Sequence, residues 1–253
     1  MTSRAGGSFH GTEVRPGLGT RKGRDARVRT ERPAPELWAW PIMPLDGRGA
    51  LRASPWGFEL TLGPLGAPGR PRWRPSPPTG GGAAAQVRSV LVASGALAAF
   101  VVLPWAVRSE ADGERLLALL AETRARPAAS IAVPIAPLGY VADTSRRVEA
   151  GGYRRAAAGE PYLHEGAVDR LGLGPGDMVL LAPVPDRASR PWLEEMARLG
   201  HGHVPTVARA VASRPLAAAL AAAGISHATG TVLGPPLRAR LGRAGPPSPA
   251  TSP

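Results

Sequence analysis

The sequence contains no cysteine and no asparagine, and it has one lysine (Lys22) and one glutamine (Gln86). The lack of cysteine excludes a disulfide scaffold, a thiolate metal site and a cysteine nucleophile. All 31 basic residues except Lys22 are arginine, and alanine, glycine and proline are abundant. These residue types share G- and C-rich codons. The formal charge of +12 therefore indicates a GC-rich genome before it indicates a nucleic-acid partner.

The positive charge is concentrated towards the N-terminus. Residues 1–88 carry 14 basic and 6 acidic side chains, which gives a net charge of +8 (14 − 6). Residues 1–35 are rich in arginine and glycine and lack a hydrophobic period, which predicts a disordered basic tail. In an alternative interpretation the protein is an adaptor whose tail contacts nucleic acid or another anionic surface. Similar composition predicts a Pro/Gly-rich linker over residues 64–86 and a disordered tail over residues 235–253.

Residues 36–63 differ from their surroundings. The segments ELWAWPI and GFELTLG show weak alternation of apolar residues and flank the turn sequence DGRG. This pattern predicts a small β-hairpin.

Residues 89–107 form a run of 19 uncharged residues between Arg88 and Arg108. This length is near the minimum that spans a bilayer, so one interpretation is a single-pass inner-membrane or plasma-membrane protein with its N-terminus in the cytoplasm. In the other interpretation the run is buried in a cytoplasmic domain as two short strands, or as a strand and a turn. No N-terminal signal peptide is visible in the sequence, which favours a cytoplasmic protein.

Residues 87–234 carry the pattern of an α/β domain. Ser109 and Asp112 have the spacing of a capping box, residues 131–136 and the run MVLLAPV that follows GLGPGD read as strands, and residues 141–158 read as a polar loop with a helical piece. Ser-Arg-Pro then occurs twice, 24 residues apart, each time at the start of a helical pattern that a strand pattern follows. Alternating strands and helices predict a small parallel, Rossmann-like sheet.

The two Ser-Arg-Pro segments are also the first candidate ligand site. Ligands of open α/β sheets bind beyond the carboxyl ends of the strands, where helix N-termini and arginines favour a phosphate or a carboxylate. The candidate residues are Asp186, Arg187, Ser189, Arg190, Ser213 and Arg214, with Asp143 and Arg146 from the polar cluster that follows residues 131–136. The alternative is that serine and proline here only begin the helices, and that the cluster is a solvated loop.

Other motifs do not assign a reaction or a cofactor. His201 and His203 are two residues apart, but no third ligand with suitable spacing accompanies them, so we predict no metal site. The G-x-G of GLGPG precedes a strand, whereas a dinucleotide fingerprint follows one. The sequence therefore predicts an α/β domain that binds a small anionic ligand, without predicting the ligand's identity.

The segment Leu173–Gly224, with LGPGDMVLL, WLEEMARLGHGHVP and PLAAALAAAG, resembles the early part of the adenylate-forming acid ligases. Members of that family often have a G-x-x-x-G-D turn into a strand, followed by a helix, a strand and a helix. The resemblance covers 52 residues (224 − 173 + 1). The family's Ser/Thr/Gly-rich phosphate loop is absent, and the chain has no room for its large further domains. We therefore do not assign the chain to this family.

Overall fold

The computed structural model describes residues 36–45, 54–63, 74–136, 141–158, 171–184, 189–200 and 204–241. The predicted tail 1–35, most of the predicted tail 235–253, and the candidate residues Asp186 and Arg187 lie outside these ranges. So do His201 and His203.

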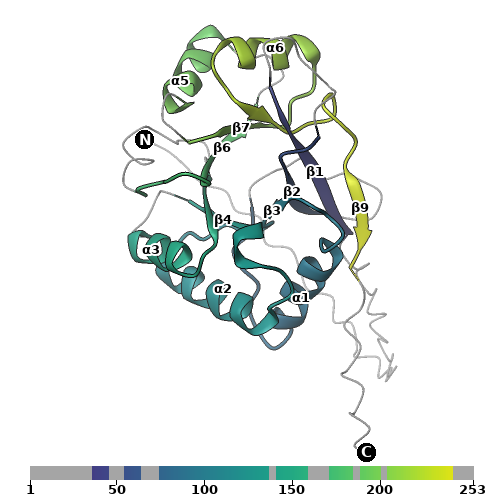
Figure 1. Cartoon of the computed structure of the whole chain (residues 1–253), viewed down its shortest axis with the longest axis vertical. Helices are drawn as coiled ribbons and strands as arrows, with labels where there is room; N and C mark the ends of the chain where they lie inside the picture. The colour runs from purple at the N-terminus through teal and green to yellow at the C-terminus, as the bar shows by residue number, and fades with distance from the viewer. Residues whose placement is uncertain are drawn as a thin grey trace, which may run out of the picture. The chain divides into compact units, whose positions relative to one another are not determined.

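Eight strands form a closed barrel (Figure 1). Six neighbouring pairs, from β2–β3 to β7–β8, are parallel, whereas β1 is antiparallel to both β2 and β8 and closes the ring. The strands are β1 (Glu36–Pro44), β2 (Gly57–Gly63), β3 (Phe100–Val102), β4 (Ile131–Ile135), β5 (Arg154–Ala158), β6 (Met178–Pro183), β7 (Thr206–Arg209) and β8 (His227–Ala228).

Helices connect the parallel strands around the outside of the barrel. In Figure 1, α1, α2 and α3 lie on one side of the barrel and α5 and α6 on the other. A short 3-10 turn, η1 (Ala128–Ser130), leads into β4. The described helices are α1 (Ala83–Ala93), α2 (Glu110–Thr123), α3 (Ala142–Ala150), α5 (Arg190–Gly200) and α6 (Arg214–Ala222).

The prediction of an open, Rossmann-like sheet is wrong. The parallel βαβ units exist, but β1 pairs with β2 over residues 36–42 and with β8 through Met43 and Pro44, which joins the two ends of the sheet. The two segments predicted to form a hairpin are therefore the strands that close the barrel. An open sheet and a barrel contain the same local units, and long-range pairing alone distinguishes them.

The 19-residue uncharged run does not form one helix. Its first residues belong to α1, and its later part contains β3. Among the described residues, no helix is both long enough and apolar enough to cross a membrane. The run is buried at both places because α1 covers the barrel and β3 is part of its wall: Val90, Leu91, Val101 and Val102 are at most 1% exposed.

Serine begins three helices as predicted. The hydroxyl oxygens accept hydrogen bonds from backbone N–H groups three residues on: Ser109 from Asp112 (3.2 Å), Ser213 from Leu216 (3.3 Å) and Ser189 from Trp192 (3.4 Å). Such bonds satisfy N–H groups that have no partner within the helix.

The prediction of a polar loop with a helical piece over residues 141–158 is right for the helical piece and wrong for the remainder. This segment forms α3 and β5. The N-terminus of α3 lacks a side-chain cap of its own, and the Glu110 carboxylate of α2 takes that place: it accepts hydrogen bonds from the backbone N–H groups of Asp143 (3.2 Å) and Thr144 (2.8 Å). The cap is supplied from 33 residues earlier in the chain, so no local pattern reveals it.

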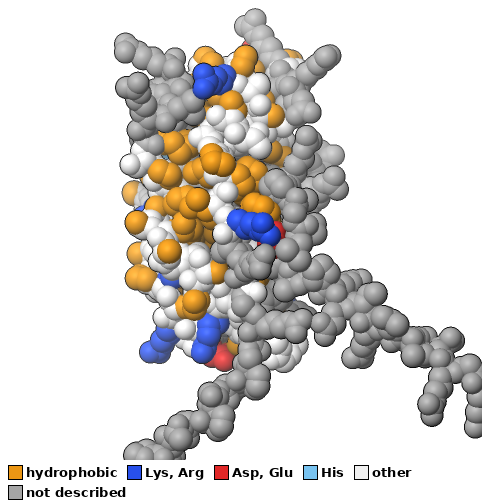
Figure 2. All heavy atoms as spheres, turned by 90° about the vertical axis from the view of Figure 1, so that its right-hand side faces the viewer, with side chains coloured by type: hydrophobic (Ala, Val, Ile, Leu, Met, Phe, Trp, Pro, Cys, Tyr) orange, Lys and Arg blue, Asp and Glu red, His pale blue; other side chains and the backbone are white. Residues whose placement is uncertain are grey.

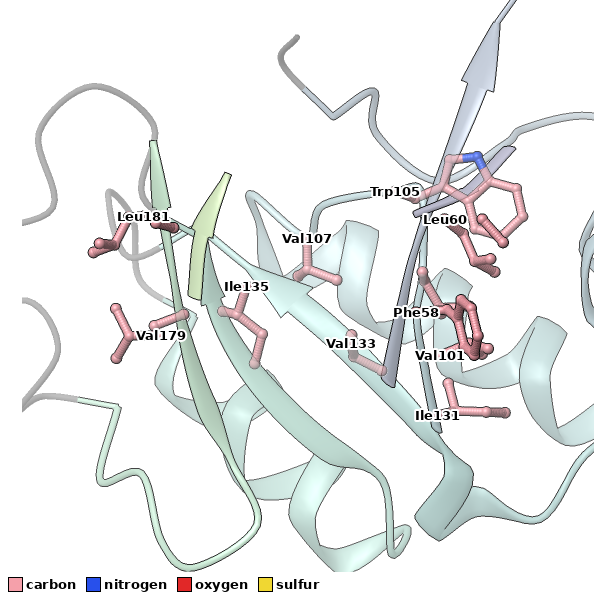
Figure 3. Packing of buried hydrophobic residues seen from close by; sticks show 14 of the residues in the cluster. Phe58, Leu60, Val101, Trp105, Val107, Ile131, Val133, Ile135, Val179 and Leu181 are labelled. Atoms are coloured by element: carbon pink, nitrogen blue, oxygen red, sulfur yellow. The ribbon is translucent and has the colours of Figure 1, made fainter. Parts of the chain in front are cut away.

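Alternation along the strands divides the core into two layers. One layer lies between barrel and helices, and Figure 3 shows side chains of this layer from β2, β3, β4 and β6 side by side. The other layer fills the barrel and consists of Ile42, Phe100, Val102, Ala132, Ala156, Met178, Leu180 and Val207. Even-numbered residues of β3 to β6 thus point inward, as do odd-numbered residues of β2 and β7.

One more strand, β9 (Leu237–Arg240), lies outside the closed ring and within the predicted C-terminal tail. β9 pairs antiparallel with residues 36–39 of β1. It lies along the same edge of β1 as β8, which pairs with Met43 and Pro44. Hydrophobic side chains gather on the face of the molecule that Figure 2 shows, and Leu237 of β9 is 51% exposed.

Aromatic rings close the amino end of the barrel. The Trp56 ring lies 4.2 Å from the His227 ring and 4.7 Å from the Phe100 ring, between centroids, and the Arg154 guanidinium lies 4.7 Å from the Phe100 centroid. Burial lowers the pKa of His227 from 6.5 to about 4.

This lowered pKa predicts that His227 weakens the fold in acid. Its folded-state pKa lies below its unfolded-state pKa, so the unfolded chain binds the proton more tightly. The free energy of unfolding should be unaffected above pH 6.5 and fall between about pH 6.5 and pH 4, by about 1–2 kcal/mol after allowing for the partial exposure of the ring. We expect His227→Gln to remove this part of the pH dependence in urea unfolding at pH 7 and pH 5. Equal pH dependence in both proteins would contradict it.

Candidate functional site

A buried cluster of charges lies at the carboxyl end of the barrel. Glu59 points inward from β2, and its Oε1 accepts hydrogen bonds from Nη2 of Arg74 (2.6 Å) and Nε of Arg209 (2.7 Å). Its Oε2 accepts one from the hydroxyl of Thr229 (3.0 Å). The exposed fractions are 0% for Glu59, 3% for Arg74 and 2% for Arg209. Arg209 ends β7 and Thr229 follows β8, so the cluster joins elements that are far apart in sequence.

The cluster keeps Glu59 ionised. Burial by itself raises the pKa of the Glu59 carboxyl, but the guanidinium groups of Arg209 and Arg74 and the hydrogen bonds from Arg209 and Thr229 outweigh it, so the pKa is lowered from 4.5. Among the described groups of the cluster, one carboxylate and two guanidinium groups leave an excess of one positive charge in a buried place. Such an excess favours a bound anion.

Some buried donors near this end of the barrel have no acceptor among the described residues. Nη2 of Arg209 and Nε1 of Trp38 make no hydrogen bond with any residue that the structure describes. Trp38 points inward from β1 by the alternation that places Ile42 inside. Its neighbour on the same face, Trp40, differs, because its Nε1 donates to Thr61 (3.2 Å). A buried N–H without an acceptor costs free energy, so each of these donors is a position where a ligand's acceptor would be stabilised.

The second inward-facing acid at this end is also paired. Glu36 of β1 is 1% exposed, and its Oε1 accepts a hydrogen bond from Nε of Arg238 (2.8 Å) on β9. By the same alternation, the inward positions near the carboxyl ends of β3, β4 and β5 carry Val102, Pro134 and Ala158. Among the described residues, no group of three or more histidine, aspartate and glutamate side chains lies close enough to hold a metal ion.

The Ser-Arg-Pro residues lie at the same end of the barrel as Glu59, because α5 follows β6 and α6 follows β7. Ser189 and Arg214 are exposed, and Ser213 is half-buried. Both serines cap their helices. The side chain of Arg190 is not among the side chains that the structure describes. No described contact joins these residues to the Glu59 cluster, so their role in ligand binding stays a prediction.

Asp143 and Arg146 lie on the first turns of α3, not in a loop. Their side chains form an ion pair with each other and are 61% and 75% exposed. The backbone N–H groups of this helix N-terminus already bind the Glu110 carboxylate. An anion from solution would compete with that carboxylate.

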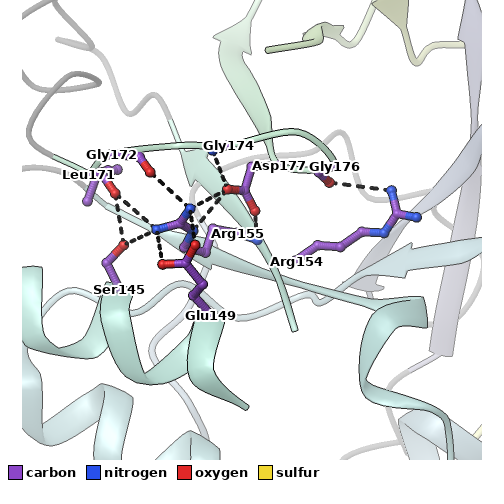
Figure 4. Close-up of polar contacts among 9 residues, drawn as sticks. All are labelled: Ser145, Glu149, Arg154, Arg155, Leu171, Gly172, Gly174, Gly176 and Asp177. Atoms are coloured by element: carbon purple, nitrogen blue, oxygen red, sulfur yellow. Dashed lines mark hydrogen bonds and ion pairs between the residues drawn. The ribbon is translucent and has the colours of Figure 1, made fainter. Parts of the chain in front are cut away.

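A second buried ion pair lies on the outside of the barrel (Figure 4). Arg155 of β5 is 3% exposed and donates to Oδ2 of Asp177 from Nε (2.9 Å) and Nη2 (2.6 Å), and to the carbonyl oxygens of Leu171 (3.2 Å) and Gly172 (3.0 Å). Asp177 also accepts from the backbone N–H groups of Arg155 (2.7 Å) and Gly174 (2.8 Å). Every strong donor and acceptor here is satisfied within the chain, so we interpret this pair as a structural tie between β5 and the turn before β6.

Sequence reasoning missed the Glu59 cluster. One signal was present: in GFELTLG a charged residue stands between Phe58 and Leu60, on the strand face opposite to these apolar residues. Arg209 and Arg74 gave no comparable signal, because arginine is the most frequent polar residue in the chain. Their proximity to Glu59 depends on closure of the barrel.

Several solved structures are similar to this chain in fold over most of its length. The EAL enzyme Bd1971, bound to cAMP and cyclic-di-GMP, matches with a TM-score of 0.59 and 14% identity over 83% of this chain and 64% of that one. The phosphodiesterase PaMucR in complex with c-di-GMP matches with a TM-score of 0.53 and 16% identity over 79% of this chain and 96% of that one. The chain has the EAL-domain fold.

The EAL-type barrel is distant in sequence from these structures. A third match, Klebsiella pneumoniae BlrP1 in a complex with calcium and cyclic-di-GMP, has a TM-score of 0.55 and 12% identity over 81% of this chain and 56% of that one. The same protein is also solved in a complex with manganese. This chain thus spans less than two thirds of the length of Bd1971 and of BlrP1. No family model matches the sequence, and no curated protein matches it significantly.

Proposed function

We propose that this EAL-type barrel binds cyclic-di-GMP, with a phosphodiester group at the carboxyl end of the barrel near Arg209. The observation that carries the proposal is the buried Nη2 of Arg209, which lacks an acceptor and belongs to a cluster with one excess positive charge. A phosphodiester oxygen would supply both an acceptor and the balancing charge. The three similar structures above are complexes that contain this ligand, which supports the choice of ligand class.

The donor at Trp38 supports the same location. Its indole N–H is a second buried donor without an acceptor, and Trp38 and Trp40 offer ring surface on the inward face of β1. Nucleotide bases stack on aromatic rings and bring acceptors of their own. An anion and a base together therefore fit this end of the barrel better than an inorganic anion alone.

Arg209→Lys tests the proposal. Lysine keeps a cation beside Glu59 but removes the second donor that guanidinium offers. We expect wild-type protein to bind cyclic-di-GMP in isothermal titration calorimetry and the variant to bind about 10–100 times more weakly, the effect of losing one charge-assisted hydrogen bond.

The matched control is Arg154→Lys, which alters an inward arginine at the opposite end of the barrel. Its affinity should equal that of the wild type. Cyclic AMP serves as a second probe, because it shares the phosphodiester but has one base. Lack of binding of cyclic-di-GMP to wild-type protein would refute the proposal, and equal weakening by both lysine variants would place the ligand elsewhere.

A further inference from the structure

The similar structures include complexes with calcium and with manganese, which raises the question of whether this chain can hold such an ion. Hard divalent cations require several oxygen ligands, mostly carboxylates. The described part of the chain offers no group of three acidic or histidine side chains in reach of one another. Glu59 itself is occupied, because Oε1 binds two guanidinium groups and Oε2 binds the Thr229 hydroxyl. The described residues around Glu59 therefore do not fit a divalent cation.

We propose that Arg74 and Arg209 take the place of a divalent cation beside Glu59, so that the barrel binds its phosphodiester ligand without a metal ion. This inference deepens the proposed function and rests on it. The net charge of the two arrangements is the same. A carboxylate with two guanidinium groups carries +1, as does a carboxylate with one divalent cation. The distances of 2.6 Å and 2.7 Å to one carboxylate oxygen are those of short charge-assisted hydrogen bonds.

Two arginines in place of a metal ion change the chemistry that the site can perform. A guanidinium group stays protonated in proteins and cannot be removed by a chelator. It donates hydrogen bonds to a phosphodiester, but unlike a metal ion it does not bind water and lower the pKa of that water. Glu59 is tied to both arginines and is not available as a general base. We therefore expect the ligand to be bound and released unchanged.

Calorimetry in three buffers tests this inference together with its premise. Cyclic-di-GMP should bind with affinities within a factor of two in EDTA, in MnCl₂ and in CaCl₂, and chromatography should recover it intact after incubation with MnCl₂. Binding that is at least tenfold tighter with Mn²⁺ or Ca²⁺ than in EDTA would overturn the inference while the proposed function stands. Hydrolysis that depends on Mn²⁺ would also overturn it.

A metal-only measurement decides the question even if cyclic-di-GMP does not bind at all. Thermal unfolding of the full chain with and without Mn²⁺ should show no shift that depends on Glu59. A stabilisation by Mn²⁺ that Glu59→Gln abolishes overturns the inference, because it places a cation at this carboxylate. Equal shifts in wild type and variant place the ion elsewhere and support the assignment of Glu59 to the two arginines.

Discussion

Glu59→Gln should lower the free energy of unfolding by about 3–5 kcal/mol, although the side chain changes by one atom. The substitution leaves Arg74 and Arg209, both at most 3% exposed, without the carboxylate that neutralises them. Two buried cations then repel each other in a place that water cannot screen well. Urea unfolding followed by tryptophan fluorescence measures the loss.

The loss of unfolding free energy caused by Glu59→Gln should become smaller in acid. The pKa of Glu59 is lower in the folded than in the unfolded chain, so its contribution is fully present above about pH 4.5 and is lost as the pH falls through the folded-state pKa. The difference between wild type and Glu59→Gln should therefore be constant above pH 4.5 and shrink below it.

Glu114→Gln provides a matched control for Glu59. Glu114 also faces an arginine, Arg147 at 2.9 Å, but the two side chains are 60% and 56% exposed. Screening and side-chain entropy limit such a pair to less than about 1 kcal/mol. Similar losses from the two glutamine variants would mean that the Glu59 cluster does not depend on burial.

Asp177→Asn is the second substitution with a large expected effect, again a loss of about 3–5 kcal/mol. The carboxylate accepts four hydrogen bonds, two from the Arg155 side chain and two from backbone N–H groups (Figure 4). An amide has one acceptor oxygen, and its NH₂ group would face donors of Arg155. The turn before β6 should loosen first, which hydrogen exchange at Gly174 and Met178 would detect.

Asp143→Asn is the corresponding control. Asp143 is paired with Arg146 on the surface of α3, and both side chains are more than half exposed. This variant should lose less than about 1 kcal/mol. If Asp177→Asn also lost less than that, Arg155 would have another way to balance its charge.

The sequence determined the local elements of this protein. Helix starts at Ser109 and Ser213 depend on a hydroxyl and an N–H three residues apart, so they can be predicted without the rest of the chain. The strands β4 and β6 and the turn before β6 were also predicted, because their apolar runs are bounded by glycine, proline or polar residues. The weak strand sequence of β5, RRAAA, was missed because two arginines and three alanines have low strand propensity.

Only the tertiary structure decided how these elements are assembled. The hairpin pattern over residues 36–63 predicts the pairing of β1 with β2. Closure of the barrel also needs β1 to pair with β8 near residue 228, and pairing over such a distance leaves no local pattern. The same closure brings Glu59 to Arg209, which lies 150 residues away, and converts an ordinary arginine into part of a buried charge cluster. The sequence predicted an anionic ligand at the strand ends from helix starts. The structure moves the centre of that proposal to Arg209, because burial and the lack of an acceptor exist only once the barrel has closed.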